Sequence, residues 1–199
     1  MYESDDLTRI VRKAADRFAS SLKRFRAWHG NEGITEANQL FQFAAAFLEM
    51  HPDGFAFMEV PFAAKEGGRT SNRLDAYLVS GEIAYLLECK RLWSPEGAAA
   101  IASDIARMRP PLLETLKRRH VHSPPTRCHG VVLADAWHPE IVRWWCRHPE
   151  SKKRWPRDGF PEDWQFDSIE VLKWSDKPQG TLYWLYGIGP NLNDGTASG

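Results

Sequence analysis

The sequence predicts an α/β fold in which helices flank a mixed β-sheet, with an extra helix at the N-terminus. Segments 5–28 and 35–50 place apolar residues at helical spacing. Segment 72–90 reads as two strands around a tight turn, and segment 128–137 is an apolar run typical of a strand buried on both faces. Because hairpin and crossover connections both occur, a mixed sheet is favoured over a purely parallel or antiparallel one.

Composition indicates one domain that folds in a reducing compartment. The chain has 199 residues, of which 43% are hydrophobic and 26% charged, and its formal net charge is zero. A uniformly basic, non-specific nucleic-acid surface is therefore not expected. Cys89, Cys128 and Cys146 form no CxxC pair, which argues against a disulfide framework or a zinc site. Without an apolar signal core or an 18-residue apolar run, we expect a cytoplasmic protein with no membrane partner.

The first half of the chain contains two helices and three strands. The helix over 5–28 has a basic face opposite its apolar stripe. The second helix starts at Thr35 as N-cap and ends near Met50. We expect a tight turn at Ser80-Gly81. The strands are expected at 55–62, 72–79 and 83–90.

The second half alternates helices and strands. Ser94 is the expected N-cap of a helix over 94–109, with Pro95 at its first position. Pro110-Pro111 interrupts this helix before it continues. The later elements are a strand at 128–137, a helix at 139–147, and two final strands in "SIEVLKW" and "TLYWLYGIG".

Charged residues interrupt the apolar hairpin at Asp75, Glu88 and Lys90. Buried charges cost several kcal/mol unless they are compensated, so these groups lie on a solvated face, pair with one another or hold a metal. A two-residue turn at Ser80-Gly81 places Asp75 on the same face as Glu88 and diagonal to it, at roughly 7–8 Å. A four-residue loop would place the two acids directly opposite. A three-residue loop without a bulge would put them on opposite faces.

Two converging carboxylates suggest a metal site. They repel each other unless a cation lies between them, and oxygen ligands suit Mg²⁺ or Mn²⁺. Lys90, on the same face, could stabilise developing negative charge or orient a water. These are the parts needed for metal-assisted phosphodiester hydrolysis. A solvated strand face or a structural ion pair would explain the same residues without any chemistry.

The combination of Asp75 on one strand with Glu88-Cys89-Lys90 at the end of the next resembles the PD-(D/E)xK nuclease superfamily, which includes many restriction endonucleases and Holliday-junction resolvases. That superfamily's core is a helix, three strands, a helix and a strand, and the expected elements over 34–135 follow this order. Leu74 stands where the superfamily often has Pro, and no Gln follows on the next helix. The resemblance implies a single domain with a restriction endonuclease-like core. Its parts are an N-terminal helix at 1–30, the core at 34–135, a C-terminal helix and strands at 136–190, and a tail at 191–199.

The resemblance also implies roles for individual residues. Asp75, Glu88 and the backbone carbonyl of Cys89 would hold Mg²⁺ or Mn²⁺, Lys90 would assist the water or the transition state, and Glu36 would complete the acid cluster. The expected partner is DNA, and a homodimer would allow both strands to be cut. The alternative is a catalytically inactive nuclease-fold module that binds nucleic acid or regulates.

The origin of the additional acid is left open by the sequence. Glu36 lies in the first turn of its helix, where an acid also simply complements the helix dipole. Glu59 interrupts the strand "FAFMEVPF" and could reach the same cavity, or could face solvent at an edge.

Further basic residues are candidates for nucleic-acid contacts. Asp104 and Arg107 are three apart on a helix and are expected to form an exposed pair, with Arg107 a candidate phosphate contact. Segment 143–157, "RWWCRHPESKKRWPR", interleaves basic and aromatic side chains, as surfaces that bind phosphates and bases do. We expect most of its Trp residues to lie in the core. The candidate phosphate contacts in this segment are Lys152, Lys153 and Arg154.

Overall fold

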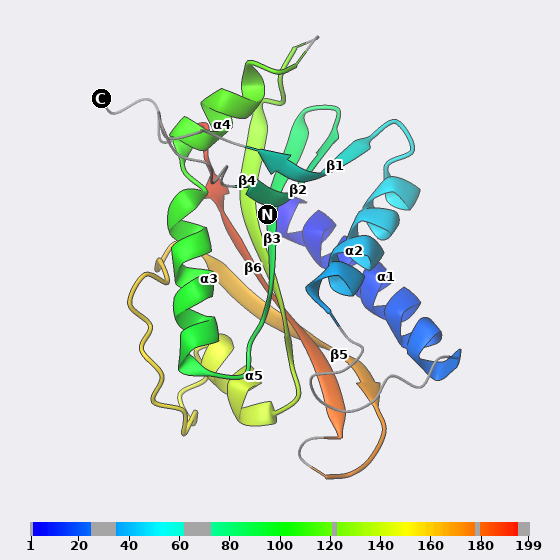
Figure 1. Cartoon of the computed structure of the whole chain (residues 1–199), viewed down its shortest axis with the longest axis vertical. Coiled ribbons are helices and arrows are strands. Elements are labelled where there is room, and N and C mark those ends of the chain that lie inside the picture. Colours follow the sequence, from blue (N-terminus) through cyan, green and yellow to red (C-terminus); the bar gives the residue numbers. More distant parts are fainter. Residues whose placement is uncertain (1, 25–34, 62–72, 121–122, 178–179, 195–199) are drawn as a thin grey trace.

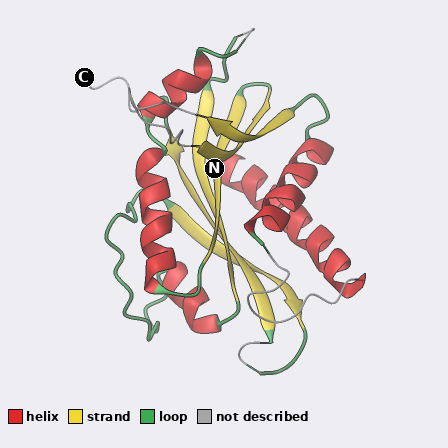
Figure 2. Ribbon diagram, in the orientation of Figure 1, coloured by secondary structure: helices red, strands yellow, loops and turns green. Residues whose placement is uncertain are grey.

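A six-stranded sheet runs through the middle of the protein, with two helices on one face and three on the other (Figures 1 and 2). The computed structural model describes residues 2–24, 35–61, 73–120, 123–177 and 180–194. The helices are α1 (Tyr2–Arg24), α2 (Glu36–Met50), α3 (Pro95–Arg107), α4 (Pro110–Lys117) and α5 (Pro139–Trp145). The strands are β1 (Phe55–Pro61), β2 (Arg73–Ser80), β3 (Ile83–Arg91), β4 (Arg127–Ala136), β5 (Gln165–Lys173) and β6 (Thr181–Asn191).

The sheet is mixed, as the sequence predicts. Its strand order is β1-β2-β3-β4-β6-β5. Only β3 and β4 pair in parallel, because the chain returns through α3 and α4 between them; the other neighbours pair antiparallel. Along the chain, the helices and strands also follow one another in the predicted order.

Two hydrophobic cores lie on the two faces of the sheet. On one face, α1 packs against β5 and β6, as Phe18 and Trp184 illustrate, and α2 packs against β2 and β3, as Phe47 and Tyr85 illustrate. On the other face, α3 packs against β3 and β4 and α5 against β4, β5 and β6, through residues such as Ile101 and Trp145, and α4 adds Leu113 to the same core. Alternation along β3 sends Glu88 to the face that α3 covers and Cys89 to the α1–α2 core, where it is buried as expected.

The hairpin turn lies one residue later than the sequence suggests. Ser80 pairs with Ile83, so the turn is formed by Gly81 and Glu82 and not by Ser80 and Gly81. Gly81 has φ +55°, a conformation that glycine adopts at no steric cost. The first position of a two-residue hairpin turn often requires such a residue, and this requirement sets the register.

The helix starts follow the predicted caps. The Ser94 side chain accepts a hydrogen bond from the Gly97 N–H at 3.3 Å, and Pro95 begins α3. Thr35 is the N-cap of α2 by position but its side chain makes no capping bond. The helix that Pro110 and Pro111 interrupt is two helices in the structure, α3 and α4.

The C-terminal part supplies the last two strands and a long loop between α5 and β5. Trp144 and Trp145 are buried, as predicted, whereas Trp155 in the loop is only half-buried. Most of the predicted tail, 195–199, lies outside the described residues. In the part of the chain that the structure describes, no helix is both long enough and apolar enough to cross a bilayer.

Candidate active site

The Lys90 ammonium lies at the centre of a group of polar atoms on the sheet face covered by α3. Its Nζ is 3.2 Å from Oδ2 of Asp104, 3.8 Å from Oε2 of Glu88 and 3.9 Å from Oδ2 of Asp75. It also donates a hydrogen bond to the Cys89 carbonyl at 3.1 Å. We call Asp75, Glu88, Lys90, Asp104 and Arg107 the Lys90 cluster.

The hairpin brings the two predicted acids together. The β2–β3 ladder ends at Ala76 and Leu87, and continuing its register places Asp75 directly across from Glu88. This is closer than the diagonal arrangement that the predicted turn gives. Beyond the ladder, Oδ2 of Asp75 accepts the Cys89 N–H at 2.7 Å, so the side chain replaces the missing backbone partner.

Helix α3 completes the cluster with two residues that the sequence placed at the surface. Asp104 is only 3% exposed, which contradicts the expected solvent-exposed pair. Arg107 donates to Oε1 of Glu88 at 3.1 Å and forms an ion pair with Asp104. The signal for this was present, since Asp104 falls within the apolar stripe between Ile101 and Ile105.

Burial dominates the electrostatics of the cluster. Glu88 is 2% exposed, and burial, then the nearby carboxylates of Asp75 and Asp104, raise its pKa to about 8 against the opposing effect of Lys90 and Arg107. Burial alone would lower the pKa of Lys90, but the three carboxylates outweigh it and raise that pKa. In the Lys90 cluster, three carboxyl groups thus surround two basic groups, and this excess of acids opposes the ionisation of Glu88.

The two candidates for an additional acid differ in position. Oε1 of Glu36, in the first turn of α2, accepts the Arg91 N–H at 3.1 Å, one residue beyond Lys90. Glu59 is exposed, has φ +52°, and pairs with Arg73 at 3.6 Å. Glu36 is thus joined to the end of β3, and the contacts of Glu59 lead away from the cluster.

The predicted metal ligands all lie near the Lys90 ammonium. Oδ2 of Asp75, Oε2 of Glu88 and the carbonyl of Cys89 all lie within 4 Å of the Lys90 ammonium, which occupies the place of a cation among them. Such an oxygen donor set, completed by waters, suits Mg²⁺ or Mn²⁺. Within the described residues no three His, Cys, Asp or Glu side chains form a metal site, so the fit depends on two carboxylates and a backbone carbonyl.

The predicted phosphate contacts lie in two places. Arg107 belongs to the Lys90 cluster. Lys152, Lys153 and Arg154 lie in the loop between α5 and β5. There the Lys152 N–H donates to Glu140 at 3.0 Å, and the Lys153 ammonium lies 4.4 Å from the ring centre of Trp155. No protein-family model, curated protein or solved structure matches this chain, so the nuclease resemblance remains a hypothesis that its own residues must support.

Proposed function

We propose that the protein is a metal-dependent nuclease that hydrolyses DNA phosphodiester bonds, with a restriction endonuclease-like core. The observation that supports this is the convergence of Asp75, Glu88 and the Cys89 carbonyl around one positively charged group. The element order α2-β1-β2-β3-α3-α4-β4, with β1 to β4 adjacent in the sheet, also agrees with the core that the resemblance implies, apart from the added helix α4.

Each member of the cluster has a role in this proposal. Asp75, Glu88 and the Cys89 carbonyl would hold Mg²⁺ or Mn²⁺, which when bound supplies an activated water and neutralises charge on the phosphate. Lys90 would stabilise negative charge on the phosphate oxygens. Asp104, the carboxylate nearest to the ammonium, would hold Lys90 when Asp75 and Glu88 take another partner. Arg107 orients Glu88 through its hydrogen bond.

Cleavage assays with matched variants test the proposal. Purified protein is incubated with supercoiled, linear and single-stranded DNA in Mg²⁺, Mn²⁺ or EDTA. We expect cleavage that depends on the metal and is lost in Glu88→Gln and Lys90→Met. Glu114→Gln is the control, because Glu114 is an exposed acid of α4 that pairs with Lys117 outside the cluster. If both cluster variants cut DNA as well as the parent, the assignment is wrong.

The same assay separates the two additional acids. Glu36→Gln should lower the cleavage rate at least tenfold if Glu36 completes the acid cluster, while Glu59→Gln leaves it unchanged. The opposite pattern would assign the role to Glu59.

A catalytically inactive nucleic-acid-binding or regulatory module is the second candidate. It is favoured by the ion pairs themselves, because Lys90 and Arg107 already neutralise most of the charge of the three acids. Calorimetric titration with Mn²⁺ separates the two. An active nuclease binds the ion and cuts, whereas protein that neither takes up Mn²⁺ nor cuts any DNA form supports the module.

A further inference from the structure

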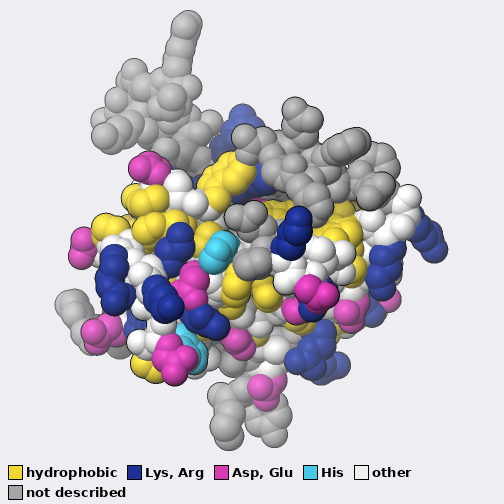
Figure 3. All heavy atoms as spheres, turned by 90° about the horizontal axis from the view of Figure 1, so that it is seen from below, with side chains coloured by type: hydrophobic (Ala, Val, Ile, Leu, Met, Phe, Trp, Pro, Cys, Tyr) yellow, Lys and Arg dark blue, Asp and Glu magenta, His cyan; other side chains and the backbone are white. Residues whose placement is uncertain are grey.

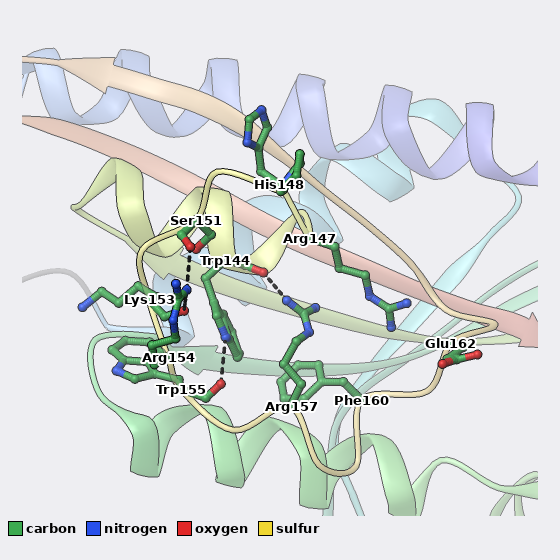
Figure 4. A pocket seen from close by; sticks show the side chains of 11 residues that line it. Trp144, Arg147, His148, Ser151, Lys153, Arg154, Trp155, Arg157, Phe160 and Glu162 are labelled. Atoms are coloured by element: carbon green, nitrogen blue, oxygen red, sulfur yellow. Dashed lines mark hydrogen bonds between the residues drawn. The ribbon is translucent and has the colours of Figure 1, made fainter.

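We propose that a second site, the pocket formed by α5 and the loop after it, binds single-stranded nucleic acid. This α5 pocket has a volume of about 640 Å³ and shares no lining residue with the Lys90 cluster (Figure 4). Its walls include Trp144, Arg147, Lys153, Arg154, Trp155 and Arg157. The proposal concerns binding alone and does not depend on the nuclease assignment.

The basic side chains of the α5 pocket form no ion pair with an acid in the part of the chain that the structure describes. Of its lining residues only Glu162 is acidic, and among the described residues no carboxylate lies within ion-pair distance of Arg147, Lys153, Arg154 or Arg157. Seen from below, Figure 3 shows several Lys and Arg side chains, with Asp and Glu among them, on the side of the molecule where this loop lies. Although the net charge of the chain is zero, this surface is locally basic and complements a polyanion.

Two of the basic residues, Arg147 and Arg157, hold the loop, and two others, Lys153 and Arg154, can serve a ligand. Arg157 donates to the carbonyls of Trp144 and Trp145, so it caps the end of α5, and burial lowers its pKa. Arg154 uses one nitrogen, Nη1, on the carbonyls of Ser151 and Lys153, which leaves its other N–H groups for a ligand. Arg154 is exposed and Lys153 is half-exposed, so both can reach phosphates.

Arg147 occupies a backbone position that normally favours glycine. It follows the C-cap of α5 and has φ +56°, in the left-handed region. An arginine there carries a conformational cost that glycine would avoid. Its guanidinium donates to the Pro161 carbonyl at 2.7 Å, and Figure 4 shows Arg147 and Arg157 on one side of Trp144, with Arg154 and Trp155 on the other.

The aromatic wall favours a single strand over a duplex. Trp155 is half-buried beside the Lys153 ammonium, so an indole and a cation are presented together. An unpaired base can stack on such a ring while its phosphate meets the basic side chains. The bases of a duplex are already stacked on one another, so the indole adds nothing to duplex binding.

Fluorescence anisotropy of a labelled single-stranded 12-mer in EDTA tests the site without cleavage. The test variant is Lys153→Gln/Arg154→Gln. The control with the same charge change is Arg118→Gln/Arg119→Gln at the end of α4, which lies at the opposite end of the molecule from α5 (Figure 1). We expect at least a tenfold weaker affinity in the test variant and less than a twofold change in the control.

Two further measurements complete the test. Trp155→Leu should weaken binding of the single strand several-fold and leave binding of the matching duplex unchanged. The affinity of the parent for the single strand should fall as the salt concentration rises, as expected for phosphate contacts. Equal affinities of test and control variants overturn the proposal. Duplex binding as tight as single-strand binding, or full displacement of the 12-mer by millimolar inorganic phosphate, overturns it as well. Because EDTA removes the metal that the proposed nuclease needs, no cleavage is expected in this assay, and strand binding tests the α5 pocket alone.

Discussion

Replacing Lys90 by methionine shows how much its ammonium compensates the acids around it. Methionine keeps much of the apolar volume but removes a charge that lies 3.2 to 3.9 Å from three carboxylates, two of them buried. Breaking a buried ion pair by removing one partner costs about 3–5 kcal/mol, because the other charge stays uncompensated. We expect a loss of about 3 kcal/mol, at the lower end of this range. The lower end applies because the Lys90 side chain is 25% exposed and Glu88, with a pKa of about 8, can take up a proton at neutral pH.

Urea unfolding at pH 7 in EDTA, followed by tryptophan fluorescence, measures this loss. The control is Lys117→Met, which breaks a surface pair with Glu114 and should cost at most about 1 kcal/mol. Adding Asp104→Asn to the Lys90 variant should recover part of the loss, because one of the uncompensated carboxylates is removed. Excess Mn²⁺ should also recover it, by about 2.7 kcal/mol at a hundredfold excess over the dissociation constant. Equal stability of the Lys90→Met and Lys117→Met variants would show that the carboxylates are solvated and that the cluster is not an electrostatic unit.

Three smaller predictions concern stability. The pKa of Glu88 is raised from 4.5 to about 8, so the folded state binds the proton more tightly, and the parent loses stability as pH rises from 4.5 to 8. In urea titrations over this pH range, Glu88→Gln should make the stability depend less on pH. An unchanged dependence would contradict the burial of this acid. Ser94→Ala should lower the free energy of unfolding by about 1 kcal/mol, since α3 loses its capping acceptor, and an unchanged urea midpoint would show that the cap is dispensable. Gly159→Ala should lower the free energy of unfolding by about 2 kcal/mol and Gly81→Ala by about 1 kcal/mol, because both residues have a positive φ. The loss is larger at position 159 because only there would a Cβ meet a neighbour, Ala102, at 3.0 Å. Equal losses would mean that the loop moves away from α3 at no cost.

The architecture was predictable because it follows from local patterns. Apolar periodicity identified both N-terminal helices, and Ser94 with Pro95 located the start of α3. The register of the hairpin was not predictable to one residue. Both Ser80-Gly81 and Gly81-Glu82 are acceptable turn sequences, and the positive φ of Gly81 selects the second.

The membership of the cluster was only partly predictable. Asp75, Glu88 and Lys90 interrupt apolar strands, so alternation alone indicated a common face. Asp104 and Arg107 were assigned to solvent because their three-residue spacing is typical of surface pairs. The apolar stripe of α3 indicated the burial of Asp104, but the strand residues that Asp104 and Arg107 meet depend on how α3 lies across β3, which no short segment encodes.

The two candidate functions differ in why a third acid is buried. With a pKa of about 8, Glu88 is protonated at neutral pH, so Asp75 and Asp104 balance Lys90 and Arg107, and a purely structural cluster also accounts for the burial of Asp104. A site that takes up a divalent cation would have a further use for Asp104, because the Lys90 ammonium must then move away from Asp75, Glu88 and the Cys89 carbonyl. The closest acceptor for the displaced ammonium is Asp104, at 3.2 Å. Asp104→Asn therefore separates the two candidates: in the nuclease it should weaken metal binding although no proposed metal ligand has changed, and in the inactive module it should lower only the stability.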